Sequence, residues 1–230
     1  MMFANPWSTI TRAHPIAWVA LIAGAAIEAL FTALAFLMPI TSGHEYVTLI
    51  NVNLFGYQIA PLYSLLLWFG SIRYTTLERI RSDPSNAFST NLLWLSVCAF
   101  IAIVPVLVTY MTVVFLIEQR PVDHGVVQTV TASVQLIMEL VIIGLVTNIA
   151  VNCGLAWGCV APIAIVLFGV SGWLFSTWNQ WIGKTIYFFL EPMPDAASLI
   201  PDKVVPFVIL AAALISVNIL ACRHVDYRSA

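Results

Sequence analysis

Two carboxylates lie inside long apolar stretches, where an ionisable side chain needs a specific reason to be present. Glu28 falls within residues 16–40, and Glu139 falls within residues 126–151. A charge at the centre of a lipid bilayer costs about 2.5–3.5 kcal/mol on insertion scales, so such residues face protein or water and often mark a route for ions or solutes. Ala20 and Gly24 share a helical stripe with Glu28. These small residues allow close helix packing and favour a structural hydrogen bond for that acid.

Glu139 ends a series of polar residues that suggests a different role. Gln128, Thr131, Gln135 and Glu139 follow one another at steps of three or four, so on a helix they share one face. Polar groups that face lipid would be left unpaired. We therefore expect this stripe to face inward and to line a substrate pathway, or the interface that encloses one.

Two further strings resemble catalytic motifs but lack essential parts. Gly169-Val-Ser-Gly172 resembles the GxSG string of rhomboid intramembrane proteases, yet the only later histidine, His224, lies near the C-terminus. A serine without a base is not an activated nucleophile, so small residues at a helix contact explain the string better. Gly183-Lys-Thr185 has only the tail of a phosphate-binding loop, because Trp178 stands where the first glycine belongs.

The composition predicts what must position these residues. Hydrophobic residues make up 61% of the chain and charged residues only 9%, a ratio typical of a polytopic α-helical membrane protein and not of a soluble domain. The net charge of -2 provides no basic surface for nucleic acid. The four cysteines have neither CxxC spacing nor histidine neighbours, so we expect buried small hydrophobes, no metal site and no disulfides.

We expect one all-α transmembrane domain over residues 1–230, because six apolar segments are each long enough to cross about 30 Å of hydrocarbon. They are Ile16–Ile40, Phe55–Ile72, Leu92–Ile117, Val126–Val151, Leu155–Trp178 and Val204–Cys222. Six basic residues lie on the side of the termini, namely Arg12, Arg73, Arg79, Arg81, Arg223 and Arg228, and three lie on the other side, namely Arg120, Lys184 and Lys203. This excess predicts that both termini are cytoplasmic in the cell membrane.

The external loop between the fifth and sixth segments is rich in apolar and aromatic residues over Trp181–Leu190, before a break at Glu191-Pro-Met-Pro-Asp195. Aromatic residues favour the headgroup boundary, and prolines stop helices. We therefore expect a re-entrant or interfacial segment at this position.

The cytoplasmic link after the second segment contains a short amphipathic pattern. Leu77 and Ile80 lie three residues apart, with Glu78, Arg79 and Arg81 around them, which suits a short helix that ends before Pro84. Such a helix could dock a partner protein. A solvated loop whose arginines only set the topology explains the same residues.

The string Thr76-Leu-Glu-Arg-Ile-Arg-Ser-Asp-Pro84 resembles the "GTLERLRxxP" segment of type-2 ABC transporter permeases, including the daunorubicin-resistance-like exporters. The resemblance implies a permease that pairs with itself or with a similar permease. It also implies export of an amphiphilic drug, lipid or peptide, driven by a separate cytoplasmic ATPase that binds ATP and Mg. In this interpretation residues 77–81 couple the permease to the ATPase, and the chain itself has no cofactor and catalyses no reaction.

Two alternatives use the same residues differently. A proton-coupled secondary transporter would use Glu28 or Glu139 as its proton carrier. An intramembrane enzyme is the third hypothesis. A neighbouring gene for a short ATP-binding subunit would favour the ABC hypothesis over the proton-coupled one.

Overall fold

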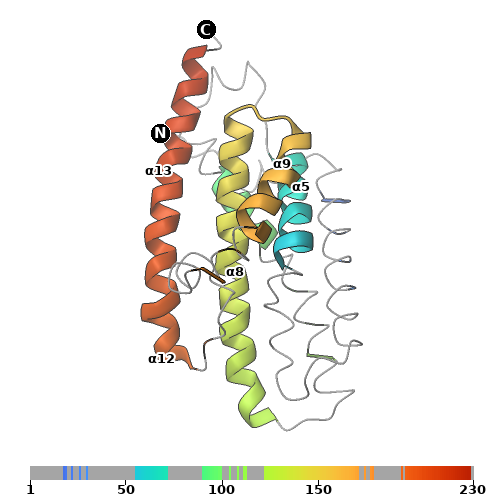
Figure 1. Cartoon of the computed structure of the whole chain (residues 1–230), viewed down its shortest axis with the longest axis vertical. Coiled ribbons are helices and arrows are strands. Elements are labelled where there is room, and N and C mark those ends of the chain that lie inside the picture. Colours follow the sequence, from blue (N-terminus) through green and yellow to red (C-terminus); the bar gives the residue numbers. More distant parts are fainter. Residues whose placement is uncertain are drawn as a thin grey trace.

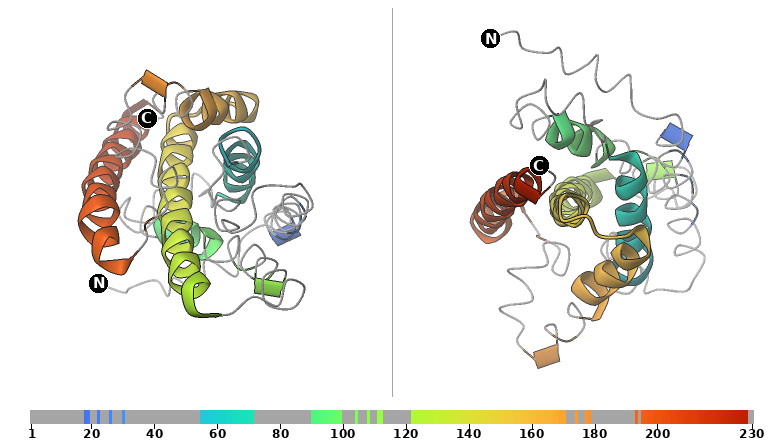
Figure 2. Two further views of the ribbon diagram at one scale, coloured as in Figure 1. Left: turned by 60° about the horizontal axis from the view of Figure 1, so that its bottom comes forward. Right: turned by 90° about the horizontal axis from the view of Figure 1, so that it is seen from above.

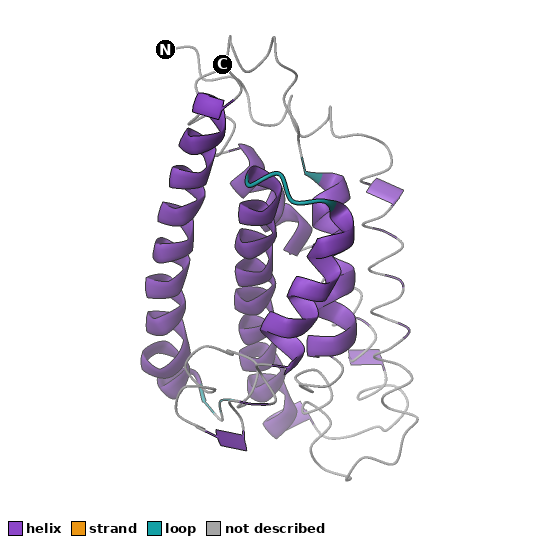
Figure 3. Cartoon of the chain, turned by 45° about the horizontal axis from the view of Figure 1, so that its top comes forward, coloured by secondary structure: helices purple, strands orange, loops and turns teal. Residues whose placement is uncertain are grey.

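The computed structural model describes residues 55–71, 90–99, 122–170 and 195–228, together with positions 18, 19, 22, 26, 30, 104, 108, 111, 112, 174, 177, 178 and 193. Every element in this part of the chain is a helix (Figure 3). The prediction of an all-α chain is therefore confirmed.

A long helix, α8 (Val122–Asn152), lies at the centre of the described elements (Figures 1 and 2). α13 (Val205–Arg228) packs along one side of it, and α5 (Ala60–Gly70) packs along the other side. α9 (Trp157–Ala164) lies against α5. The central helix therefore has protein neighbours on two sides, and any polar group on those sides is enclosed.

Two helices are long and apolar enough to cross a membrane, namely Val130–Asn152 and Ala197–Ala221. They correspond to the predicted fourth and sixth segments. The described parts of the second, third and fifth segments include shorter apolar helices, at Ala60–Gly70, Thr90–Ala99 and Trp157–Val170. The full number of six spans stays a prediction.

The sixth segment begins earlier than its hydropathy predicts. Hydropathy places its first residue at Val204, but the helix already begins with α12 (Ala196–Leu199) and continues through η4 (Ile200–Val204) into α13. The Asp195 carboxylate caps this start by accepting from the Ser198 backbone N–H at 2.7 Å. The cap therefore places the helix start ahead of the apolar stretch.

Wide π-helical turns occur where prolines interrupt the helices. η1 (Phe55–Ile59) comes just before Pro61, and η4 comes just before Pro206. A proline ring inside a helix clashes with the carbonyl four residues earlier, and both of those carbonyls lie within the π turns. A third π turn, η3 (Ile165–Val170), follows Pro162 of α9. η1 and η4 thus widen the helix where a regular α-turn would clash with the proline ring.

Gly154 ends α8 and turns the chain towards α9. Its φ of 74° lies in the left-handed region, which glycine adopts without a steric penalty. The Gly154 N–H donates to Val151 O at 3.0 Å, and the Leu155 N–H donates to Ala150 O at 3.0 Å. This pair of bonds is the Schellman motif, and it satisfies two carbonyls that the helix end leaves open.

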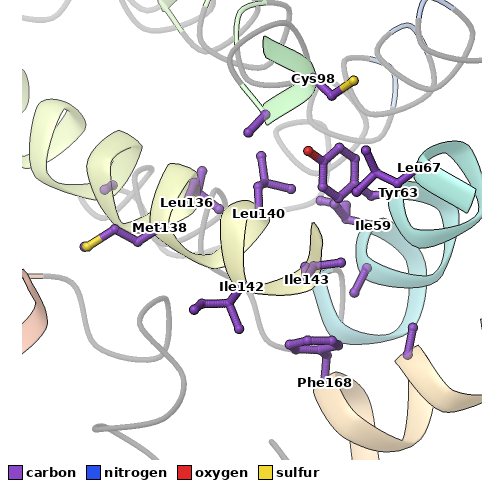
Figure 4. Packing of buried hydrophobic residues seen from close by; sticks show 14 of the residues in the cluster. Ile59, Tyr63, Leu67, Cys98, Leu136, Met138, Leu140, Ile142, Ile143 and Phe168 are labelled. Atoms are coloured by element: carbon purple, nitrogen blue, oxygen red, sulfur yellow. The ribbon is translucent and has the colours of Figure 1, made fainter. Parts of the chain in front are cut away.

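The hydrophobic core lies where α5, α8 and the π turn after α9 meet (Figure 4). Tyr63 and Ile143 are fully buried there, and Leu140 and Phe168 pack around them. Gly144 brings the helix Thr90–Ala99 close, because a Cβ on it would lie 2.4 Å from the Leu95 Cδ1. The core thus fixes α8 against three neighbouring elements.

Indole hydrogen bonds tie several elements together at one end of the bundle. The Trp94 Nε1–H donates to Gly70 O at 2.9 Å, and the Trp68 Nε1–H donates to Leu155 O at 3.2 Å. These bonds join the end of α5, the helix Thr90–Ala99 and the turn before α9. The two ends of the link that holds the predicted coupling residues, Ser71 and Thr90, therefore lie at the same end of the bundle.

The expectation of buried cysteines holds for only one of the three that the structure describes. Cys98 is buried, whereas Cys153 and Cys159 are exposed. Cys153 lies in the turn after α8, and nothing described covers the side of α9 that carries Cys159. An apolar sequence neighbourhood predicts the membrane, but it does not predict burial against protein.

Candidate functional site

The polar stripe of α8 faces the interior, as the spacing predicts. Thr131, Gln135 and Glu139 are 2%, 0% and 1% exposed. Steps of four residues keep the three side chains within about 80° of the helix circumference, at 3.6 residues per turn. Gln128 lies on the same helix, but its side chain is outside the described residues. The three described residues of the stripe form a buried polar face on an otherwise apolar helix.

Two members of the stripe hold the backbone of one residue. The Thr131 Oγ1–H donates to Met193 O at 3.0 Å, and Gln135 Oε1 accepts from the Met193 N–H at 3.3 Å. Met193 is itself buried and lies outside any helix. Irregular backbone inside a membrane protein is tolerated where protein satisfies its polar groups, and these two side chains do so. Thr131 and Gln135 therefore anchor the chain just ahead of α12.

Glu139 lies one helical turn beyond Gln135, among apolar neighbours. Leu136, Met138 and Leu140 of the same helix belong to the core, and Tyr63 of α5 is fully buried in it (Figure 4). A carboxyl in such a place can hold a proton, accept a hydrogen bond or attract a cation. It is the ionisable member of the stripe.

Lys203 is a buried residue that sequence reasoning places elsewhere. The count of basic residues treats it as external, but in η4 it is 1% exposed, next to the exposed Asp202. A buried ammonium group requires compensating partners. Lys203 is therefore part of the packed interior and does not act as a surface charge. Hydropathy could not reveal this, because a lysine ahead of an apolar stretch is also typical of a membrane boundary.

The depth of Lys203 follows from the register of the two long helices. α8 and α13 run in the same direction (Figure 1), and Asn218 bonds both Leu145 O and Asn152. Lys203 precedes Asn218 by fifteen residues, so with equal rise per residue it lies about level with residues 130–137 of α8. Lys203 therefore lies at the same level along the bundle as Thr131 and Gln135. The three residues form a polar layer ahead of Glu139.

Asn218 is a second buried residue that the sequence analysis did not single out. Its Nδ2 donates to Leu145 O at 3.1 Å and to Leu214 O at 3.0 Å, and its Oδ1 accepts from Asn152 Nδ2 at 3.3 Å. It is 0% exposed. A signal was present, since this is the only amide side chain within Val204–Cys222. The side chain fixes α13 against α8.

The GxSG-like string contributes a helix contact at its first glycine. A Cβ on Gly56 would lie 2.5 Å from Phe168 O and 2.7 Å from the Gly169 Cα, so η1 and η3 touch backbone to backbone. This contact agrees with the interpretation of the string as small residues at a helix crossing. Ser171 itself lies outside the described residues.

Several predicted sites fall on residues that the structure does not describe. These are Glu28, the re-entrant segment Trp181–Leu190, and the coupling residues Leu77, Glu78, Arg79, Ile80 and Arg81. Their roles stay predictions. In the described part of the chain, no three His, Cys, Asp or Glu side chains come together in a way that could hold a metal ion.

The chain was compared with protein families, curated proteins and solved structures. No family model, curated protein or solved structure matches it.

Proposed function

We propose that this chain is a membrane-embedded transport permease and that the buried face of α8 borders its substrate pathway. The observation that supports this most is Glu139, a carboxyl that is 1% exposed within the apolar helix Val130–Asn152. Ionisable residues at such positions are rare, and they mark ion or substrate routes often enough to make a functional role the first hypothesis.

The surface of α13 supports a membrane environment. Only 6% of the apolar window of Ala197–Ala221 is buried, and Val208, Ile209 and Leu220 are largely exposed. Contiguous apolar surface of this length is unfavourable in water and favourable against lipid.

An aromatic group supports the same environment at one end of the bundle. The Phe69 and Trp157 ring centroids are 6.2 Å apart, and Trp68 packs edge-on against Phe69. Trp157 and Phe69 are both exposed. Tryptophan is enriched where a membrane meets water, so this group fits one membrane boundary.

We assign the energy source to a separate cytoplasmic ATPase that binds ATP and Mg, as the resemblance over Thr76–Pro84 implies. The permease would act as a dimer, with itself or with a similar chain, and export an amphiphilic drug, lipid or peptide. Residues 77–81 would contact the ATPase. The short distance between the two ends of this link supports a compact docking element, since Trp94 ties the start of the helix Thr90–Ala99 to Gly70.

The coupling proposal is tested by reversing charges in the link. A Glu78→Lys, Arg79→Glu double variant should lose co-purifying ATPase activity while its amount in the membrane stays normal. The matched control is Glu118→Lys, Arg120→Glu, which makes the same exchange of charges in a link that we predict on the opposite side of the membrane. If the first variant retained full ATPase activity, or if both variants lost it equally, the coupling role would be wrong.

Proton-coupled transport is the second candidate, and the burial of Glu139 is the observation that favours it. Glu139→Gln keeps the shape and the hydrogen-bonding capacity but removes the titrating proton. In proteoliposomes this variant should abolish uptake driven by a pH gradient if Glu139 carries protons. ATP-driven transport with Glu139→Gln would instead change mainly for cationic substrates. Thr131→Val serves as the control, because it perturbs the same stripe without changing an ionisable group.

A further inference from the structure

A small cavity lies at the end of the bundle where α5 ends. It has a volume of about 20 Å³ and is lined by the end of α5, the start of the helix Thr90–Ala99 and the last turns of α8. Its apolar wall is formed by Leu67, Trp94, Leu95, Gly144 and Val151. Its polar wall is formed by Ser71, Asn91, Thr147 and Asn148. Polar groups therefore line one side of this small space.

The hydroxyl groups of this wall present acceptors. The Ser71 Oγ–H donates to Trp68 O at 2.9 Å, and the Thr147 Oγ1–H donates to Ile143 O at 2.8 Å. Each hydroxyl thus uses its only hydrogen within its own segment, and its lone pairs can accept from another group. Asn148 is 8% exposed and adds an amide with two donors and an acceptor oxygen.

We propose that this cavity is a binding site for one ordered water molecule, which bridges Asn148 and Thr147 of α8 to Ser71 after α5. About 10–15 Å³ is enough for one water, provided that two to four polar partners surround it. The volume is too small for an organic ligand, and the polar wall disfavours an apolar one. The water extends the hydrogen bonds of Trp94 and Trp68, so that the ends of α5 and α8 are held together by polar contacts.

The water site does not depend on the transport function, and hydroxyl-radical labelling tests it directly. X-ray radiolysis of the purified full chain in lipid nanodiscs generates radicals at bound water as well as in bulk solvent. Oxidation is then measured by mass spectrometry. Leu95 lines the cavity, whereas Leu145 is also buried and does not line it, so the comparison involves one residue type. Leu95 should be oxidised several-fold faster than Leu145, and equal rates would overturn the proposal.

Bulk water is distinguished from bound water by a radical scavenger. The scavenger should quench oxidation at the exposed Leu155 and leave that of Leu95 largely unchanged. Equal quenching would mean access from bulk solvent and would also overturn the proposal. Asn148→Leu fills the polar space and should lower the Leu95 rate to that of Leu145. Thr147→Val, which keeps the shape of the wall, should lower it partly and provides the test if the first variant does not fold.

Discussion

At the scale of single residues, the buried polar side chains of α8 divide into anchors and an ionisable group. Thr131 and Gln135 use their hydrogen bonds to hold Met193, whereas Glu139 adds a titratable group one turn further along. The spacing of the stripe predicts that all of them face inward. It could not predict the anchor, because Met193 lies 58 residues beyond Gln135 in the sequence.

Asn218 provides a test of how strongly α13 is fixed to α8. Asn218→Ala removes bonds to Leu145 O, Leu214 O and Asn152, and should destabilise the fold by about 1–2 kcal/mol, the upper range for hydrogen bonds between membrane helices. Unfolding in mixed detergent micelles measures the change. Ser216→Ala is the control, because Ser216 is exposed and its hydroxyl donates to Ala212 O of its own helix. Equal stability of the two variants would contradict the role of Asn218.

Asp195 makes the start of the sixth segment sensitive to pH. Hydrogen bonds from the Ser198 side chain and backbone hold the pKa of Asp195 below its ordinary value of 3.8. Since the folded pKa is the lower one, the stabilisation is complete above 3.8 and is lost as pH falls through the folded value. Amide exchange at Ser198, corrected for its intrinsic pH dependence, should therefore lose protection only in strong acid.

An Asp195→Asn variant separates the charge from the cap. Asparagine also caps helices well but does not titrate in this range. Its Ser198 amide should keep the same protection at every acidic pH. If the variant lost protection in acid as the native chain does, the Asp195 carboxylate would not be the cause of the pH dependence.

At the scale of elements, the crossing of η1 and η3 is a contact with very little room. Gly56→Ala would place a Cβ 2.5 Å from Phe168 O, and a backbone atom cannot rotate away as a side chain can. Overpacking of this kind typically costs about 1–3 kcal/mol. The thermal unfolding temperature of the purified protein should fall accordingly.

Gly158 is the matched control for that substitution. It lies in α9, and a Cβ added to it would have nothing within 4 Å. Gly158→Ala should therefore be neutral or should stabilise the helix by up to about 1 kcal/mol. If Gly158→Ala decreased the stability as much as Gly56→Ala does, the crossing of η1 and η3 would not be the reason for the effect of Gly56→Ala.

Helix type and the position of the fourth segment could be predicted from hydropathy, whereas helix irregularities could not. The expected Val126–Val151 lies within α8, because a long apolar run between polar ends leaves little choice. η1 and η4 depend on how a proline ring meets an earlier carbonyl, and the early start at Ala196 depends on one capping carboxylate. Both are local backbone effects that an average over a window of residues does not record.

At the scale of the whole molecule, the predicted topology places the turn after α8 and the start of α12 on opposite sides of the membrane. Both positions are exposed, at Cys153 and Asp195. Their reactivity with two maleimides therefore tests the predicted sides. In intact cells, a variant that keeps only Cys153 should react with a membrane-permeant maleimide but not with an impermeant one, because the predicted topology places this turn on the cytoplasmic side. 

The contrasting position, Asp195, lies ahead of the sixth segment. In a chain without native cysteines, Asp195→Cys lies ahead of the sixth segment on the external side, so it should react with both reagents. A cysteine at Arg228 should react only with the permeant reagent, because the C-terminus is predicted to be cytoplasmic. The reverse pattern at Asp195 and Arg228 would invert the topology, and reaction of both with the impermeant reagent would exclude a span between them.

In the membrane environment that we propose, the length of the C-terminal helix would have to match the thickness of the bilayer. Asp202 is exposed ahead of the apolar stretch, and the next charged residue after Lys203 is Arg223. The 21 steps from Asp202 to Arg223 span about 32 Å at 1.5 Å per residue, which is close to the roughly 30 Å of a typical hydrocarbon layer. An upright helix with these two charges at its limits is therefore about as long as the hydrocarbon layer is thick. Thicker membranes would draw a charge into hydrocarbon, and thinner ones would force the helix to tilt away from α8, so bilayer thickness itself becomes a determinant of how the bundle packs.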